Sequence, residues 1–465
     1  MPNHPTPRPR RIAAGLALLL AALAPAVAAA RPLRVPYETF TLSNGLQVFV
    51  HEDRSVPIVS VNTWYRVGSG DEDPGRTGFA HLFEHIMFMG SQNVPTGDFD
   101  RLLEAAGADN NGSTTTDRTN YYEDGPVNAL PLMLWLDSDR MGYLLPEITA
   151  EKLDIQRGVV QNERRQSYEN QPYGLAQENI LKRLYPKEHP YHWPVIGSMA
   201  DLSAATLDDV RSFFQRFYTP NNATLAIAGA ISAREARALV EHWFGDIPRG
   251  PDVRRREAPA FRLEADVHAT LEDRVQLPRA YNTWHTTRAY HADDAALDVL
   301  GYVLAGGKSS RLYKRLVYEL QIATQVTAYQ YAGRLDGMFT LYATARPGHH
   351  LDELQRVFDE EIARLAAEGP TAREIERVKN QVEAQFLDAM ERVGGFDGKA
   401  DRLNHYAYFL GEPDSFEKDL ARYRAVTPAD VQRVARTYMK ERHRVVLSVV
   451  PTGKPDLAVS EGRTP

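Results

Sequence analysis

The chain has 465 residues, no cysteine and a net charge of −7 at neutral pH, with 43% hydrophobic and 25% charged residues. This composition is typical of a well-packed globular protein of two or more domains, and the acidic balance argues against nucleic acid as a partner. Without cysteine the chain has no disulfides, no thiolate metal ligands and no lipidation at cysteine.

Residues 1–30 have the pattern of a secretory signal peptide. Three arginines give a basic start, residues 12–23 form an apolar stretch too short to span a bilayer, and residues 28–30 are alanines typical of a cleavage site. We expect cleavage after Ala30 and a periplasmic or secreted protein without a membrane span; a retained anchor is the alternative. Loss of the three arginines changes the net charge from −7 to −10, which mildly favours cationic peptides as partners.

The segment His81-Leu-Phe-Glu-His85 is the strongest chemical signal in the chain. Apolar residues surround it, and we expect a helix with Thr77 as its N-cap. His81 and His85 then project from one face, with Glu84 beside them. This spacing is the H-x-x-E-H signature of the inverzincin zinc peptidases. The alternative is a helix with two solvated or hydrogen-bonded histidines.

A third metal ligand has to come from another segment, because catalytic zinc takes three protein ligands and keeps a fourth position for water. Glu163 fits best, with Glu151 and Glu169 as competitors. The segment around Glu163 is expected to form a half-buried helix, and its apolar residues are Leu153, Ile155, Val159 and Val160. The residues alone do not separate Glu163 from a solvated helix acid.

Several segments, taken in order, resemble one known family. They are residues 41–50 as an opening strand, 78–91 as a metal-binding helix, 111–121 as a substrate strand and 217–229 as a closing strand. The chain from Thr41 to Pro248 thus resembles the N-terminal domain of the insulysin, pitrilysin and mitochondrial processing peptidase family. This resemblance implies an α+β fold of two homologous domains that enclose a substrate chamber. Each domain would be a largely antiparallel sheet with helices packed against it.

The resemblance also implies roles for single residues. Zn²⁺, one ion per chain, would be held by His81, His85 and Glu163, and Glu84 would be the catalytic base that takes a proton from water. An extended peptide would add as a strand along four residues, where main-chain hydrogen bonds supply affinity and read little sequence. These four substrate-binding residues are Asn111, Gly112, Ser113 and Thr114.

One departure from the family lies close to the metal ligands. Many active relatives carry a glutamate seven residues before the third ligand, where this chain has Gln156. A glutamine can still hydrogen-bond a ligand histidine, but it brings no charge. The three ligands and the base remain, so the substitution bears on metal affinity or rate.

Prolines, glycines and arginines at residues 249–260 interrupt the hydrophobic pattern and predict a linker. We expect it to join a metal-binding peptidase domain, residues 31–248, to a homologous domain, residues 261–456. A polar tail, residues 457–465, would follow.

The two halves look like copies of each other with different chemistry. Thr206-Leu-Asp-Asp-Val210 recurs as Thr427-Pro-Ala-Asp-Val431, each in a helix that leads into a strand. Aligning the halves places Asp298, Gly301 and Tyr302 where the first half has His81, Glu84 and His85. We therefore expect no metal site in the second half, and core-facing helices at residues 351–367 and 372–392.

The second half also departs from active relatives, which contribute from it an arginine and a tyrosine seven residues apart that reach the substrate carbonyl. The corresponding positions here hold Val317 and Thr324. Arg311 and Tyr318 have the same spacing but lie six residues early. Loss of such a carbonyl-polarising donor typically costs ~10²–10³ in rate, so the chain is expected to be poorly active alone.

Taken with the resemblance, these residues predict an exported zinc metalloendopeptidase for short or unstructured peptides. We expect it to be the catalytic subunit of a heterodimer whose homologous partner supplies the Arg/Tyr pair. The alternative is a non-catalytic structural or peptide-binding homologue in a larger complex. A zinc-dependent amidase for a small molecule is less favoured, because the family's two-domain chamber suits peptides.

Two other histidine pairs are weaker candidates for a metal. Pro190 breaks helical geometry between His189 and His192, so a surface loop is expected. His349 and His350 have no evident partner acid in the sequence, and we expect a solvated loop pair.

Overall fold

The structure is a computed structural model that describes residues 33–259 and 261–460. The predicted signal peptide lies outside the described residues. Residues from Val35 onward form one compact unit. Within the described ranges, no helix is both long enough and apolar enough to cross a membrane.

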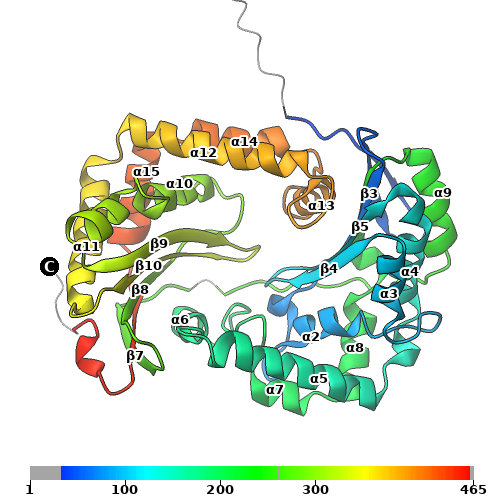
Figure 1. The fold of residues 1–465 in the computed structure, drawn as a ribbon, viewed down its shortest axis with the longest axis horizontal. Helices are drawn as coiled ribbons and strands as arrows, with labels where there is room; N and C mark the ends of the chain where they lie inside the picture. The colour runs from blue at the N-terminus through cyan, green and yellow to red at the C-terminus, as the bar shows by residue number, and fades with distance from the viewer. Residues whose placement is uncertain (1–32, 260, 461–465) are drawn as a thin grey trace, which may run out of the picture. The chain divides into compact units, whose positions relative to one another are not determined.

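The first half forms a six-stranded sheet with the order β1-β2-β6-β3-β5-β4, of which Figure 1 labels β3, β4 and β5. Its strands are β1 (Glu38–Thr41), β2 (Gln47–Glu52), β3 (Ile58–Tyr65), β4 (Asp109–Thr114), β5 (Thr119–Pro126) and β6 (Ala223–Gly229). β2 and β6 are parallel, and the other neighbours are antiparallel. This order places β4, which contains the predicted substrate-binding residues, at the edge of the sheet.

The expected opening strand at residues 41–50 is a hairpin and not one strand. β1 ends at Thr41 and β2 begins at Gln47, and between them Gly45 donates its N–H to the carbonyl of Leu42. Gly45 has a φ of +93°, a left-handed conformation that glycine adopts without steric cost. The signal for this turn was present in the sequence, because Asn44-Gly45 is a dipeptide typical of hairpin turns.

Helices of the first half pack against the sheet, and the apolar core lies between them. They are α2 (Phe79–Ile86), α3 (Asp98–Ala105), α4 (Leu130–Gly142), α5 (Ala150–Arg164), α6 (Ala176–Leu184), α7 (Met199–Ala204), α8 (Leu207–Phe217) and α9 (Ala233–Phe244). A π-helical turn, Arg165–Glu169, continues α5. Phe79, Leu82, Phe83 and Ile86 of α2 are buried in one large apolar cluster with residues of the sheet, so burial fixes the face that α2 turns to the core.

The second half forms a five-stranded sheet with the order β7-β11-β8-β10-β9. Its strands are β7 (Val267–Asp273), β8 (Arg279–His285), β9 (Ala323–Ala332), β10 (Gly337–Ala345) and β11 (Arg444–Pro451). Its helices are α10 (Asp294–Ala305), α11 (Leu351–Glu368), α12 (Ala372–Glu391), α13 (Lys399–Leu410), α14 (Phe416–Ala425) and α15 (Pro428–Val434). π-helical turns lie at Tyr313–Glu319, before β9, and at Ala435–Lys440, after α15. α11 and α12 lie where the sequence predicted two core-facing helices.

Apart from the additional strand β1 at one edge of the first sheet, the two sheets share one topology, which supports the duplication inferred from the sequence. β2-β6-β3-β5-β4 corresponds position by position to β7-β11-β8-β10-β9, and the parallel pair lies at the same place in each sheet. Thr206 and Thr427 cap equivalent helices, and each forms a capping box with an aspartate three residues later. The fold is therefore α+β with two similar halves, as predicted. The exact domain bounds stay predictions.

One helix of the second half packs against the sheet of the first (Figure 1). On α13, Asp401 accepts a hydrogen bond from Trp64 Nε1 at 2.7 Å, and the Asn404 amide donates to the main-chain oxygen of Asn62 at 2.8 Å. All four residues are buried, so the two halves share polar contacts that exclude water.

Candidate metal centre

Helix α2 starts at a tight approach between two main chains. Gly78 is its N-cap with a φ of +88°, and a Cβ added there would lie 2.8 Å from the carbonyl oxygen of Ile196. The expected N-cap Thr77 is wrong by one position, because its hydroxyl donates to Asp201 instead. Sequence reasoning also missed Glu72, whose buried carboxylate accepts the N–H groups of Gly78 at 3.0 Å and Ala80 at 2.8 Å. An acid shortly before an amphipathic helix was the available signal.

Three predicted ligands converge where α2 meets α5. Glu163 Oε2 lies 3.6 Å from His81 Nε2 and 3.3 Å from His85 Nε2. Tetrahedral zinc with bonds of about 2.0–2.2 Å holds its ligand atoms roughly 3.3–3.6 Å apart, so these spacings fit the ion. Among residues 33–259 and 261–460, this is the one group of three histidine, cysteine or acidic side chains with ligand atoms close enough to hold a metal.

The electrostatics of the group suit a metal cation. Burial lowers the pKa of His81 to about 4, so its imidazole is neutral at pH 7. The hydrogen bond from His85 lowers the pKa of Glu163, whose carboxylate is therefore ionised. Metals bind neutral imidazole and ionised carboxylate, and these two groups are in that form without further proton release.

The structure separates Glu163 from its competitors. Glu151 is exposed at the start of α5, and Glu169 pairs with Arg164 at 3.3 Å. The buried side of α5 is narrower than predicted. Leu153 and Val160 are buried as expected, but Ile155 and Val159 are 49% and 42% exposed. These two lie four residues apart on the face that turns away from the core.

Glu84 lies against the edge strand β4. Its Oε2 accepts a hydrogen bond from Thr114 Oγ1 at 2.6 Å, and a Cβ added at Gly112 would lie 3.1 Å from Glu84 Cγ. Partial burial raises the pKa of Glu84. The predicted base and two of the predicted substrate-binding residues, Gly112 and Thr114, are therefore in contact. Asn111 and Ser113 lie on the same strand.

Gln156 is buried on α5 but contacts no ligand histidine through a hydrogen bond in the described structure. Its amide nitrogen lies 2.6 Å from Met89 Sδ. The Nδ1 atom of His81 is buried and has no hydrogen-bond partner among the described residues. The role predicted for Gln156 stays a prediction.

The equivalent place in the second half holds different chemistry. On α10, Asp298 accepts a hydrogen bond from Tyr423 at 2.7 Å, and Tyr302 donates to Gln385 at 2.9 Å. A Cβ added at Gly301 would lie 3.2 Å from the carbonyl oxygen of Ala328 on β9. At this position α10 therefore lies directly against the main chain of β9. No metal-binding group occurs in the described part of this half.

The positions expected for the Arg/Tyr pair are filled by small side chains. Val317 lies in the π-helical turn after Leu312, and the Thr324 hydroxyl donates to the carbonyl of Thr344 at 3.3 Å. Arg311 and Tyr318 have the expected spacing of seven residues but lie six residues early. Arg311 forms an ion pair with Glu374 at 2.7 Å, and Tyr318 is 65% exposed.

The remaining histidine pairs belong to ordinary polar contacts. His189 lies in a loop, as predicted, but it is buried and its Nδ1 accepts the N–H of Tyr191 at 3.0 Å. His349 does have a partner acid, because its Nδ1 lies 3.0 Å from Glu353 of the following helix turn. His350 caps that helix, α11.

Comparisons with known proteins agree with this geometry. The chain is 27% identical over 424 residues to the zinc protease PqqE of Helicobacter pylori, covering 89% of this chain and 93% of the relative. It is 24% identical over 430 residues to the mitochondrial-processing peptidase subunit beta of Blastocladiella emersonii, covering 90% of each.

Solved structures share the fold. The crystal structure of a protease from Helicobacter pylori matches with a TM-score of 0.83 and 26% identity, covering 90% of this chain and all of that one. The first half of the periplasmic protease PqqL from Escherichia coli matches with a TM-score of 0.74 and 20% identity, covering 92% and 95%. At 20% identity, the second match is evidence for the fold alone.

Two family models match in sequence order and together cover more than half of the chain. The model described as insulinase (peptidase family M16) matches residues 47–193, which include the three converging side chains and Glu84. The model described as the peptidase M16 inactive domain matches residues 204–382, which include Asp298, Gly301 and Tyr302. With ligand geometry, fold and relatives in agreement, the chain belongs to the insulinase family, peptidase family M16.

Proposed function

We propose that the chain is a zinc-dependent endopeptidase for short or unstructured peptides. The observation that carries the proposal is the convergence of His81, His85 and Glu163, with Glu163 at distances from both histidines that fit tetrahedral zinc. Beside them, Glu84 of α2 lies against the edge strand β4. Relatives named zinc protease support it.

The three side chains would hold one Zn²⁺. When bound, the ion supplies a Lewis acid that polarises the scissile carbonyl and lowers the pKa of its water. The chain's own residues supply the proton transfer and the alignment of the peptide.

Glu84 is the group we assign to proton transfer. Thr114 holds its Oε2 in place, so Oε1 is the oxygen that takes a proton from water and later passes it to the leaving amine. The raised pKa of Glu84 brings it closer to the working pH, where a carboxylate can both accept and release a proton.

Strand β4 is the element we assign to peptide binding. It is the last strand in its sheet, so its outer edge can pair with an extended peptide through main-chain hydrogen bonds. Gly112 lets the strand approach Glu84, because any larger residue would press on Glu84 Cγ. Such binding selects extended conformation more than sequence.

The test is the Glu84→Gln variant. It keeps the shape and the Thr114 contact but cannot accept a proton, so we expect a normal zinc content and no peptide cleavage. Zinc is measured by elemental analysis and cleavage with a peptide library. Glu104→Gln, an exposed acid on α3, is the matched control and should behave as wild type. Undiminished turnover by Glu84→Gln contradicts the assigned role.

We further propose that the active form is a heterodimer. Val317 and Thr324 cannot polarise a carbonyl, and Arg311 is held by Glu374, so another chain would supply the Arg/Tyr pair. One relative is named as a subunit of a processing peptidase. Co-expression with an exported two-domain homologue that lacks H-x-x-E-H should raise cleavage by orders of magnitude. If the isolated chain, monomeric by light scattering, already matches the mixture, this proposal fails.

An inert role in a larger complex is the competing function, and metal content decides between the two. Purified protein with less than about a tenth of an equivalent of zinc favours the inert role, because a peptidase of this type needs its ion. A periplasmic or secreted location also belongs to the proposal and depends on residues 1–30 as a signal peptide.

A further inference from the structure

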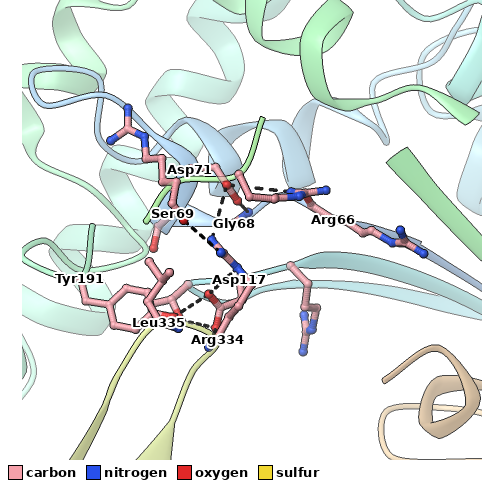
Figure 2. A network of polar contacts seen from close by, with 12 residues as sticks. Arg66, Gly68, Ser69, Asp71, Asp117, Tyr191, Arg334 and Leu335 are labelled. Carbon is pink, nitrogen blue, oxygen red and sulfur yellow. Dashed lines mark hydrogen bonds and ion pairs between the residues drawn. The ribbon is translucent and has the colours of Figure 1, made fainter. Parts of the chain in front are cut away.

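A buried polar network joins the turn between β4 and β5 to the turn between β9 and β10 (Figure 2). Asp117, in the first turn, accepts hydrogen bonds at both carboxylate oxygens, from Tyr191 Oη at 2.6 Å and from the main-chain N–H of Arg334 at 2.8 Å. Tyr191 Oη also accepts the N–H of Leu335 at 3.1 Å. Asp117 and Tyr191 are only 3% and 2% exposed. We name this network the tip contact.

The tip contact is closely packed on the side of the second half. A Cβ added at Gly333 would lie 2.4 Å from Tyr191 Oη and 2.8 Å from Asp117 Oδ2, so a larger residue would displace the groups that form the contact. Two further hydroxyls of the second half contact the first turn: Tyr331 Oη, on β9, lies 2.6 Å from Thr116 Oγ1, and Tyr408 Oη, on α13, donates to the carbonyl of Asp117 at 3.2 Å. The second half therefore fixes the position of the first turn.

The same turn is bound on its other side by main chain of the first half. Ser69 donates its N–H to the carbonyl of Thr115 at 3.1 Å, and Gly70 donates to that of Thr116 at 2.8 Å. Gly68 is essential to this approach, since a Cβ there would lie 2.4 Å from the Thr115 oxygen. The turn is thus held between the tip contact and residues 68–70.

Residues 68–70 continue directly into the support of the metal helix. Glu72 follows them, and its carboxylate binds the N–H groups at the start of α2. Trp193 Nε1 lies 3.0 Å from both the Ser69 carbonyl and Glu72, which ties the two ends of this segment together. A shift of the β4–β5 turn would therefore be transmitted to the start of α2.

On the β4 side, the turn is connected to Glu84, the proposed base. Thr114, the last residue of β4, precedes the turn directly and donates its hydroxyl to Glu84. The turn thus connects the end of the proposed peptide-binding strand with the helix that carries Glu84 and the two histidines.

We propose that Asp117 and Tyr191 are positioning residues, through which the second half holds β4 and α2 at the relative position that places a bound peptide against Glu84. The proposal rests on the proposed peptidase function. It gives the second half a role in the reaction, and this role does not require a metal site in that half.

The test compares two Tyr→Phe variants. Tyr191→Phe removes the hydroxyl that bridges Asp117 and Leu335, and Tyr438→Phe removes another tyrosine–aspartate hydrogen bond, to Asp293 at 2.9 Å, which lies wholly within the second half. We expect Tyr191→Phe to lower kcat about 10- to 100-fold, since misplacement of about 1 Å can cost that much. KM should change by less than about threefold, zinc content should be normal, and Tyr438→Phe should keep the wild-type kcat.

Amide hydrogen exchange provides a readout that does not depend on activity. Tyr191→Phe should speed exchange in residues 109–114 relative to wild type, and Tyr438→Phe should not. Asp117→Asn, which preserves shape, serves as the milder variant if Tyr191→Phe folds poorly. An unchanged kcat with unchanged exchange in β4 overturns the proposal, and so does an equal loss of kcat in both Tyr→Phe variants. If wild type cleaves no peptide but exchange responds as expected, the peptidase function fails and the positioning contact stands.

Discussion

The two halves of the molecule share the order of five strands but differ in the side chains where a helix meets the edge strand. In the first half, α2 brings the Glu84 side chain to β4, and the strand makes room with Gly112. In the second half, α10 has Gly301 at the corresponding position, and the helix lies against the main chain of β9. Under the proposed function, one copy of the duplicated fold carries the chemistry and the other copy supports it.

The largest expected effect comes from a pair of substitutions at equivalent positions. His81→Asn should lose most of its zinc and lower cleavage by roughly 10³-fold or more, because a three-ligand site loses a neutral nitrogen donor. Asp298→Asn, its counterpart on α10, should keep full zinc and cleavage. Elemental analysis and peptide assays check both. Equal zinc loss in the two variants would mean that the halves are not as different as their side chains indicate.

Buried ion pairs provide the next largest contrast. Arg140 in the first half is 1% exposed and lies between Glu123, at 2.6 Å, and Asp137. Arg140→Met should cost about 3–5 kcal/mol of unfolding free energy, because two buried carboxylates lose their partner. Arg422 pairs with Asp294 and Asp419 but its side chain is 21% exposed, so Arg422→Met should cost less. Urea unfolding of both variants measures the difference.

Two glycine substitutions sharpen the contrast at the helix–strand junctions. Gly112→Ala places a methyl group 3.1 Å from Glu84 Cγ and 3.2 Å from the Tyr121 ring, so Glu84 must move, and cleavage should fall about tenfold. Gly301→Ala places a methyl group 3.2 Å from the Ala328 carbonyl oxygen and 3.5 Å from Tyr329 Cα, touches no proposed site residue, and should leave cleavage unchanged. Steady-state kinetics with one peptide are sufficient, and a normal rate for Gly112→Ala would exclude the close fit as a requirement.

The smallest expected effect is a difference in pH dependence. Burial raises the pKa of Asp298 to about 7, so between about pH 4 and 7 the native state binds more protons than the unfolded state. Its contribution to stability therefore falls as the pH rises through this range, and Asp298→Asn should remove that fall. In metal-free protein, the contribution of His81 to the pH dependence of stability has the opposite sign. Its lowered pKa makes stability rise with pH between about pH 4 and 6.5. Melting temperatures at pH 5 and 8 compare the two.

The local chemistry could be predicted from the sequence because it depends on spacing along single helices. His81, Glu84 and His85 fall on one helix face wherever that helix packs. Glu163 needed the family resemblance, since a glutamate near a helix end looks like any solvated acid. Its meeting with the histidines depends on how α5 packs on α2, which no local pattern encodes.

The tip contact could not be predicted for a related reason. Asp117 and Arg334 are 217 residues apart, and the donor is a main-chain N–H that every residue except proline carries. Unlike the tip contact, the hairpin at Gly45 had a signal in the sequence, because Asn44-Gly45 is a dipeptide typical of hairpin turns. Contacts made by backbone leave little trace in side-chain patterns, and here they support the site.

An edge that accepts a peptide can also accept another copy of the same protein, and β4 has a composition that discourages this. Its sequence Asp-Asn-Asn-Gly-Ser-Thr contains no apolar side chain and is rich in residues that strands disfavour. Two such edges would gain little from pairing with each other. This composition suits the proposed role of β4, because a strand that pairs poorly with its own copy stays available for a bound peptide.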